Sequence, residues 1–275
     1  TMLGVYAEKV ENMIVASADL SNSDKTDGFL KKTKEFQKGD FTGQFFQAGV
    51  AELTMACVMN GMALHGGIIP ACGTFFVFSD YMKPAIRMAA LMELPVKFIW
   101  THDAFRVGED GPTHEPVEQE AQIRLMEKLK NHSHKNSMLV LRPADVDETT
   151  VAWKMALENQ DTPTALILSR QNVKNLPRKE SKYNEALGAT KGAYIVKDCE
   201  GTADVILLAS GSEVSTLVAA TELLESRANL NVRIVSVPSE GLFFSQPESY
   251  IRSVIDYNLP IFGLTAGLPL SMQRL

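Results

Sequence analysis

Residues 96–103 read VKFIWTHD and give the clearest indication of the fold. The mostly apolar run Val96–Trp100 is followed at once by Thr101, His102 and Asp103. Such a short run is typical of a strand buried in a parallel sheet. In an open α/β sheet, ligands bind in the crevice beyond the carboxyl ends of the strands. The stretch therefore predicts a buried strand with site chemistry at its carboxyl end.

The same alternation continues on both sides of this stretch. Further strands are predicted at Met13–Ala16, Ile68–Ala71, Met138–Leu141 and Ala165–Leu168. Stretches with a helical pattern lie between them, at 51–64, 81–94, 118–129 and 148–158. This order predicts an α/β fold with a parallel sheet covered by helices. Because polar residues also follow two more of the strands, we expect one shared pocket that includes SADLSNS (17–23) and SRQN (169–172).

A second α/β unit is predicted in the last part of the chain. Residues 176–192 are polar without a strong apolar run, which indicates a linker between a domain at 1–175 and another at 193–275. In the second domain, VILLA (205–209), VRIVSV (232–237) and IFGLTAG (261–267) are typical of strands, and 214–224 of a helix. A parallel domain with so few strands is too small to close its own core. We therefore expect an incomplete second domain, cut short in this chain.

Composition excludes several classes of protein. The chain has 275 residues, of which 45% are hydrophobic and 22% charged, as in an ordinary globular protein. The net charge of −6 argues against a general nucleic-acid binder, and no apolar run approaches the ~18–20 residues of a membrane helix. Three scattered cysteines without a CxxC pair fit a reduced, cytoplasmic setting. No group of histidines and carboxylates has the spacing of metal ligands.

The segment VGEDGPTHEPV (107–117) carries the densest potential chemistry. It contains Glu109, Asp110 and His114, between glycines that permit unusual backbone angles and prolines that fix them. Stiffening of this kind beside acidic and imidazole groups favours a functional loop. The alternative is a structural turn with a solvated histidine.

Two further patterns each have a structural and a functional interpretation. Phe75, Phe78 and Tyr81 recur at i, i+3 and i+6, so on a helix they would share one face. That face would be either part of the core or a platform on which an aromatic ligand stacks. Glu52 lies in the apolar stretch AELTMACVMNGMAL, where it either begins a helix or is buried with a perturbed pKa. Buried glutamates are rare and often functional.

The motifs, taken together, resemble those of transketolases. They occur in family order with nearly family spacing over essentially the whole chain: SADLSNS (17–23), GVAE (49–52), TFFVFSDY (74–81), THD (101–103), GEDGPTHEPVEQ (108–119), RPAD (142–145), LSRQN (168–172) and GSEV (211–214). The resemblance implies a complete pyrimidine-binding domain at 1–175 and the start of the C-terminal domain. It also implies that an N-terminal domain is absent, which in the family holds the cofactor's diphosphate and a divalent metal, Mg²⁺ or Ca²⁺.

The activity implied by the resemblance is transfer of a two-carbon ketol unit from a ketose phosphate to an aldose phosphate. The family uses thiamine diphosphate, belongs to the pentose phosphate pathway and works as a homodimer with active sites between subunits. We therefore expect sugar phosphates as partners, a cytoplasmic location, and no activity from this chain alone.

The resemblance also assigns roles to single residues. Glu52 resembles the glutamate that hydrogen-bonds the cofactor's aminopyrimidine and promotes its activation, so it counts as catalytic. The other residues expected around the cofactor are Asp19, Leu20, Phe75, Phe78 and Tyr81.

On the substrate side, His114 resembles the catalytic histidine near the reacting carbon, and Asp110 the aspartate that recognises a substrate hydroxyl. Ser23, His102 and Arg170 resemble the groups that hold the sugar phosphate, where arginine gives paired charge-assisted hydrogen bonds.

The sequence departs from the family pattern in two of the motifs and in an insertion around 128–137. HDAFR (102–106) stands where HDSIG is usual, and THEP (113–116) where THQP is usual. These changes leave substrate preference open. The alternatives are a natural C-terminal subunit of a split transketolase, an enzyme like 1-deoxyxylulose-5-phosphate synthase or dihydroxyacetone synthase, and a catalytically inactive assembly module. The retained Glu52, Asp110, His114 and Arg170 argue against the module.

Overall fold

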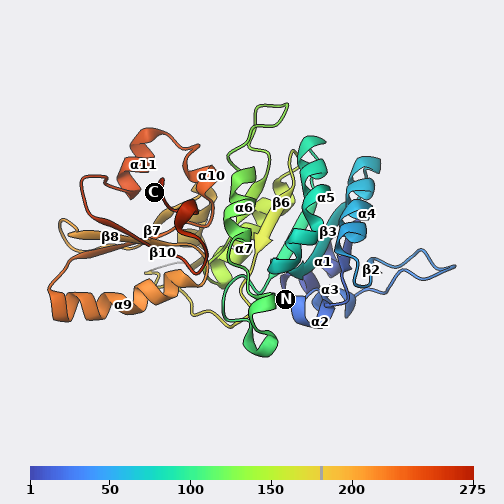
Figure 1. Ribbon diagram of the computed structural model, residues 1–275, viewed down its shortest axis with the longest axis horizontal. Coiled ribbons are helices and arrows are strands. Elements are labelled where there is room, and N and C mark those ends of the chain that lie inside the picture. The colour runs from blue at the N-terminus through green and yellow to red at the C-terminus, as the bar shows by residue number, and fades with distance from the viewer. Residues whose placement is uncertain (180–181) are drawn as a thin grey trace.

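The computed structural model describes residues 1–179 and 182–275 of the chain. Figure 1 shows two sheets, each with its own helices, arranged along the long axis of the molecule. The first sheet has six strands in the order β2-β1-β3-β4-β6-β5, and every neighbouring pair is parallel. The strands are β1 (Met13–Ser17), β2 (Phe45–Gln47), β3 (Ile69–Phe75), β4 (Lys97–Thr101), β5 (Leu139–Leu141) and β6 (Thr164–Ile167).

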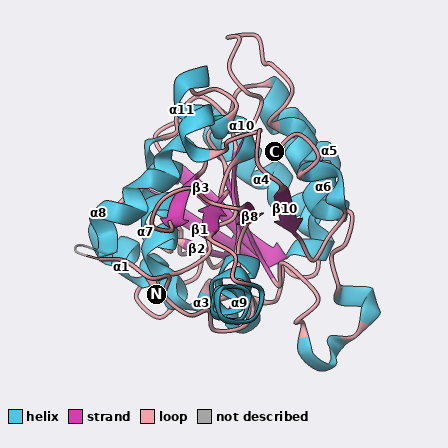
Figure 2. Cartoon of the chain, turned by 90° about the vertical axis from the view of Figure 1, so that its left-hand side faces the viewer, coloured by secondary structure: helices cyan, strands magenta, loops and turns pink. Residues whose placement is uncertain are grey.

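Helices cover both faces of this sheet (Figure 2). Alternate residues of β4 show why, since successive side chains of a strand point to opposite faces. Phe98 and Trp100 belong to one apolar cluster and Ile99 to the other. Helices α4 and α5 contribute to the first cluster and α1, α3 and α7 to the second. The helices are α1 (Met2–Lys9), α2 (Ser21–Asp24), α3 (Asp27–Leu30), α4 (Glu52–His65), α5 (Ser79–Leu91), α6 (Gln119–Met126) and α7 (Val146–Glu158).

The predicted parallel α/β fold is confirmed, and the five predicted strands correspond to β1, β3, β4, β5 and β6. The short edge strand β2 was not predicted. The predicted helical face shared by Phe75, Phe78 and Tyr81 is wrong for Phe75, which ends β3 in pairing with Thr101 of β4. A 3-10 turn, Phe76–Phe78, then leads into α5. The strand continues past residue 71. Cys72 and Gly73 pair with both β1 and β4, Thr74 pairs with β4, and all three residues are buried.

The second sheet has four strands in the order β10-β8-β9-β7. Strands β8, β9 and β10 are parallel and correspond to the three predicted ones, whereas β7 was not predicted and runs antiparallel to β9. The predicted second α/β unit is confirmed, and the antiparallel edge strand that the sequence analysis missed adds Ile195 and Val196 to its two apolar clusters. The elements are β7 (Tyr194–Lys197), β8 (Val205–Ala209), α9 (Glu213–Ala228), β9 (Val232–Ser236), α10 (Glu240–Phe243), α11 (Glu248–Val254) and β10 (Ile261–Leu264).

The predicted linker contains structure of its own. It holds α8 (Lys182–Ala186) and a 3-10 segment (Leu187–Lys191), while residues 180–181 lie outside the described residues. Ala186 and Ala189 are buried in a small cluster with Val151 of α7. Small residues give no strong apolar signal, which is why the sequence pattern did not indicate this packing.

Candidate functional site

All the predicted site residues lie at the carboxyl edge of the first sheet. Because the six strands are parallel, the segments that follow them meet at that edge. Figure 1 shows α2 and the green loop around residues 104–117 on the same lower side of this sheet. In strand order, the residues are Glu52 after β2; Asp19, Leu20 and Ser23 after β1; Phe75, Phe78 and Tyr81 at and after β3; His102, Asp110 and His114 after β4; and Arg170 after β6.

Three aromatic rings form a row at the centre of this edge. The Phe75 and Phe78 ring centroids lie 6.0 Å apart with planes at 8°, and those of Phe78 and Tyr81 lie 6.0 Å apart at 21°. Phe75 is 5% exposed and Tyr81 62% exposed, so the row runs from the core to the surface. A row of nearly parallel rings suits a flat aromatic ligand, which stacks in an offset arrangement.

Two histidines join this aromatic row. The His102 ring stacks on Phe75 with centroids 3.6 Å apart, and the His114 ring meets Phe78 edge-on at 5.3 Å. The structure thus brings together predicted cofactor residues and predicted substrate residues from two neighbouring strands. His114 is half-buried in a 3-10 turn, Pro112–His114, and its Nδ1 lies 2.8 Å from Thr113 Oγ1.

His102 is the most strongly perturbed of the predicted substrate residues. Burial lowers the pKa of its imidazole to about 4, and the positive charge of Arg170 lowers that pKa further, while Asp110 opposes both. The ring is therefore neutral at pH 7, so one nitrogen donates and the other accepts. Arg170 itself is exposed and reaches the Asp110 loop at Gly108, where a Cβ would lie 2.9 Å from the guanidinium. Gly108 has φ +79°, so glycine is needed there for both reasons.

Glu52 is the first residue of α4 and is 8% exposed. The helix N-terminus favours a negative charge there. Among residues 1–179 and 182–275, no other side chain hydrogen-bonds its carboxylate. Glu52 therefore presents a nearly buried carboxyl group, without a side-chain partner in the described residues, at the same edge of the sheet as the stacked rings.

The segment after β1 is held by a residue that the sequence analysis missed. Asp24 is 1% exposed, accepts from Ser17 Oγ at 2.7 Å and from the Thr26 backbone N–H at 2.9 Å, and has its pKa raised by burial. It fixes α2, which contacts β3 and β4. Asp19 and Ser23 are exposed on the rim of the site, and Leu20 is half-buried.

Sequence reasoning also missed three residues that form a buried chain of charges next to the predicted substrate residues: Asp103, Arg142 and Glu213. Asp103 is 4% exposed, and its Oδ2 accepts from Arg142 Nε at 3.0 Å. Arg142 in turn binds Glu213 of the second domain. The motifs THD, RPAD and GSEV contain these residues, but nothing in their spacing indicates that they pair.

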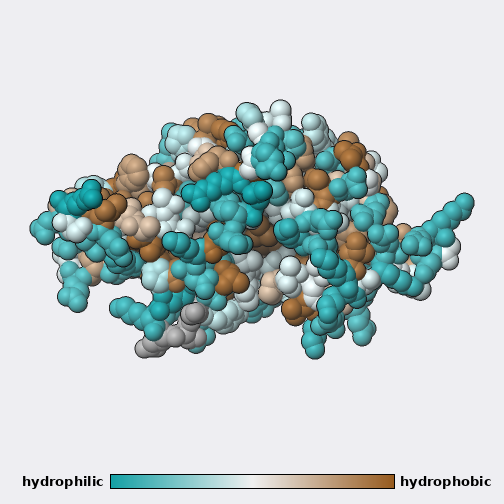
Figure 3. Space-filling model, turned by 90° about the horizontal axis from the view of Figure 1, so that it is seen from below, coloured by the Kyte–Doolittle hydropathy of each residue, from teal (hydrophilic) through white to brown (hydrophobic). Residues whose placement is uncertain are grey.

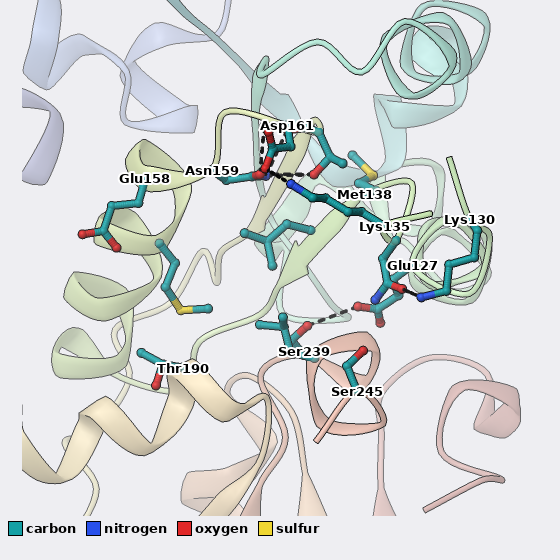
Figure 4. A pocket seen from close by; sticks show the side chains of 15 residues that line it. Glu127, Lys130, Lys135, Met138, Glu158, Asn159, Asp161, Thr190, Ser239 and Ser245 are labelled. Carbon is teal, nitrogen blue, oxygen red and sulfur yellow. Dashed lines mark hydrogen bonds and ion pairs between the residues drawn. The ribbon is translucent and has the colours of Figure 1, made fainter. Parts of the chain in front are cut away.

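A cavity of about 560 Å³ lies at the opposite edge of the sheet and contains none of the predicted site residues (Figure 4). Its walls come from the start of β5, the end of α7 and the α10 region of the second domain. Figure 4 shows Ser239 pointing to Glu127 and Lys135 pointing to Asp161. Its charged side chains are already paired in this way, and no stacked rings or histidines line it. We therefore place the site at the carboxyl edge.

Within residues 1–179 and 182–275, no group of three or more histidines, cysteines, aspartates or glutamates is placed to hold a metal ion. No helix in that part of the chain is long and apolar enough to cross a bilayer. On the face seen from below in Figure 3, hydrophobic residues are scattered among hydrophilic ones.

Known families identify the class of protein. Residues 1–175 match the family described as "Transketolase, pyrimidine binding domain", and residues 192–275 match "Transketolase-like TK C-terminal domain". The chain is thus of the thiamine-diphosphate-dependent class. The first match covers more than half of the chain, so the chain belongs to the transketolase family.

Its relatives include transketolases from several bacteria. The chain is 48% identical over 254 residues to that of Halalkalibacterium halodurans and 45% identical over 254 residues to that of Aquifex aeolicus. These matches cover 92% of the chain but 36% and 35% of the two relatives. The chain therefore spans little more than a third of the length of the curated relatives it matches.

Solved structures give the same result. The transketolase from Leishmania mexicana has a TM-score of 0.86 at 37% identity, covering 97% of this chain and 37% of that one. A Pichia stipitis transketolase in complex with sedoheptulose 7-phosphate has a TM-score of 0.84 at 36% identity, covering 97% and 38%. A split-gene transketolase, described as an inactive tetramer, shares the fold with a TM-score of 0.64 at 22% identity, covering 95% and 84%.

Proposed function

We propose that this chain supplies the pyrimidine-binding side and the substrate side of a transketolase active site. The proposed reaction moves a two-carbon ketol unit from a ketose phosphate to an aldose phosphate. The observation that carries the proposal is the contact of two histidines with the aromatic row, at the carboxyl edge of a domain of the transketolase family: His102 stacks on Phe75, and His114 meets Phe78 edge-on.

On the cofactor side, Phe75, Phe78 and Tyr81 would stack with the aminopyrimidine, and the Glu52 carboxyl group would hydrogen-bond its ring nitrogen. Asp19 and Leu20 would border the ring. When bound, thiamine diphosphate supplies the electron sink that a two-carbon transfer needs. No other side chain of the described residues competes for the oxygens of Glu52, so its carboxyl group is available to the ring nitrogen.

On the substrate side, Arg170 would bind the phosphate with its guanidinium, and neutral His102 would add one hydrogen bond. Ser23 on α2 would add another. Asp110 would recognise a hydroxyl group, and His114 would donate or accept a proton near the reacting carbon. Binding the distant phosphate can position the reacting end of the sugar.

The diphosphate and its Mg²⁺ or Ca²⁺ would be held by a part of the enzyme that this chain does not match. We further propose that the working enzyme is a homodimer in which that part of one subunit faces this part of the other. The domain boundaries at 175 and 193 belong to the same proposal.

The test is a fusion in which this chain replaces the matching third of the Halalkalibacterium halodurans transketolase. Xylulose 5-phosphate and ribose 5-phosphate are supplied with thiamine diphosphate and Mg²⁺, and sedoheptulose 7-phosphate is measured. We expect its formation by the fusion and none by this chain alone. A folded fusion that binds the cofactor but forms no sedoheptulose 7-phosphate contradicts the proposal. Formation of deoxyxylulose 5-phosphate from pyruvate and glyceraldehyde 3-phosphate would instead support the synthase-like alternative.

A further inference from the structure

A buried chain of charges connects the second domain to the substrate side of the first. We call Asp103, Arg142 and Glu213 the interdomain relay. Arg142 Nη2 lies 2.9 Å from Asp103 Oδ2 and 2.9 Å from Glu213 Oε2. The side chains of Asp103 and Arg142 are 1% exposed and that of Glu213 is 8% exposed. A guanidinium with several donors in a rigid plane can hold two carboxylates at fixed positions.

The backbone of the second domain closes around the same guanidinium. Arg142 Nη1 donates to the Ser210 carbonyl at 3.1 Å, and the Gly211 N–H donates to the Arg142 carbonyl at 3.1 Å. A Cβ at Gly211 would lie 2.8 Å from Arg142 Nε. This close contact requires glycine at position 211. The 210–211 segment therefore orients Arg142 at its backbone carbonyl and at its guanidinium.

Asp103 connects Arg142 to two loops of the site. It directly follows His102, whose backbone has φ +58°. Its Oδ2 also accepts from Ser169 Oγ at 3.3 Å, and Ser169 directly precedes Arg170. One carboxylate thus fixes the neighbours of both proposed phosphate ligands, although they follow different strands.

The arrangement is more than a source of stability. Replacing a buried ion pair with apolar residues is often neutral or stabilising, so burial alone does not explain it. Asp103 Oδ1 is buried without a hydrogen-bond partner among the described residues. Such an atom costs free energy. Glu120 of α6 also approaches Arg142, at 3.3 Å, so the guanidinium already has a counter-charge without Asp103. A function in positioning explains the unpaired oxygen.

We propose that Asp103, Arg142 and Glu213 are positioning residues through which the second domain fixes His102 and Arg170 for the substrate phosphate. This inference rests on the function proposed above. It predicts that the relay affects the substrate end of the site and leaves the cofactor end, at Glu52 and Phe78, unchanged.

The first test needs no enzymatic activity. In this chain, NMR follows the titration of the His102 imidazole in the wild type and in Glu213→Gln, which replaces one carboxyl oxygen beside Arg142 and keeps the shape of the side chain. The wild-type pKa is about 4. Loss of the relay lets water reach the ring, so we expect the pKa to rise toward about 6.5.

The matched control is Glu240→Gln. It also changes a buried second-domain carboxyl group beside a first-domain guanidinium, Arg124 at 3.5 Å, but this group contacts neither Arg142 nor Asp103. We expect its His102 titration to match the wild type. If Glu213→Gln does not fold, Ser169→Ala cuts only the hydrogen bond to Asp103. It should then weaken the perturbation of Arg170 resonances by inorganic phosphate.

The second test uses the fusion enzyme. Glu213→Gln should raise KM for ribose 5-phosphate about tenfold or more, as expected for small misplacement of a binding group, with the thiamine diphosphate affinity unchanged. A folded Glu213→Gln with unchanged His102 pKa and unchanged KM overturns the inference. A shifted His102 pKa in this chain with an inactive wild-type fusion leaves the positioning intact and counts against the proposed function.

Discussion

The imidazole of His102 and the carboxylate of Glu52 lie at the same edge of one sheet and owe their properties to different causes. His102 is neutral because its ring is buried against Phe75. Glu52 lies at a helix N-terminus, where the backbone N–H groups favour its charge. The motifs of the sequence predicted that both residues belong to the functional site. Their state depends on burial and neighbours, which the sequence does not show.

Glu52→Gln tests the residue on which the proposed chemistry depends most. In the fusion enzyme we expect turnover to fall by about 10²–10⁴-fold, the range typical of a lost acid–base contribution. The free energy of unfolding should stay nearly unchanged, because no side-chain hydrogen bond of Glu52 is lost within the described residues. Steady-state kinetics and urea unfolding measure the two quantities. Unchanged turnover would show that the assigned role is wrong.

At the scale of elements, strands formed by long apolar runs were predictable from the sequence, and short strands at the sides of the sheets were not. The strand over 205–209 was predicted with its observed bounds because it is a run of large apolar residues. Strands β2 and β7 have three and four residues and lie at sheet edges, where partial exposure weakens the apolar pattern. β3 was predicted too short because Gly73 and Thr74 interrupt the pattern, yet both pair with β4.

The turn before α9 carries a prediction with an internal control. Gly211→Ala adds a Cβ 2.8 Å from Arg142 at φ +64°, so it should cost both backbone strain and a displaced guanidinium. Gly201→Ala has φ +84° with nothing within 4 Å, so it should cost strain alone. We expect Gly211→Ala to lower the free energy of unfolding by about 1–3 kcal/mol more than Gly201→Ala does. Urea unfolding of both variants measures the difference, and equal losses would contradict the close fit.

At the scale of the whole molecule, buried charges join the two domains. Arg124 and Arg142 of the first domain face Glu240 and Glu213, the first residues of α10 and α9 in the second. Sequence analysis found the motifs at both ends of these contacts. It could not predict the contacts, because the partners Arg142 and Glu213 are 71 residues apart and each motif looks complete without the other.

These charges predict a pH-dependent stability. Burial raises the pKa of Glu240 from 4.5 to about 7, although Arg124 opposes this. Between pH 4.5 and pH 7, the folded protein therefore holds a proton that the unfolded chain has lost. The resulting contribution to the free energy of unfolding is fully present below pH 4.5 and is lost as the pH rises through 7. Glu240→Gln removes it. Between pH 5 and pH 8, its free energy of unfolding should fall by about 1–2 kcal/mol less than that of the wild type. Parallel curves would contradict the raised pKa.

The position of Arg142 in the chain also has a consequence for synthesis. As the polypeptide leaves the ribosome, Arg142 meets Asp103 and Glu120 first, because both precede it. Its last partner, Glu213, follows 71 residues later. All six strands of the first sheet, which end at Ile167, are therefore synthesised before residues 210–213, so the first domain leaves the ribosome with one partner of Arg142 still missing.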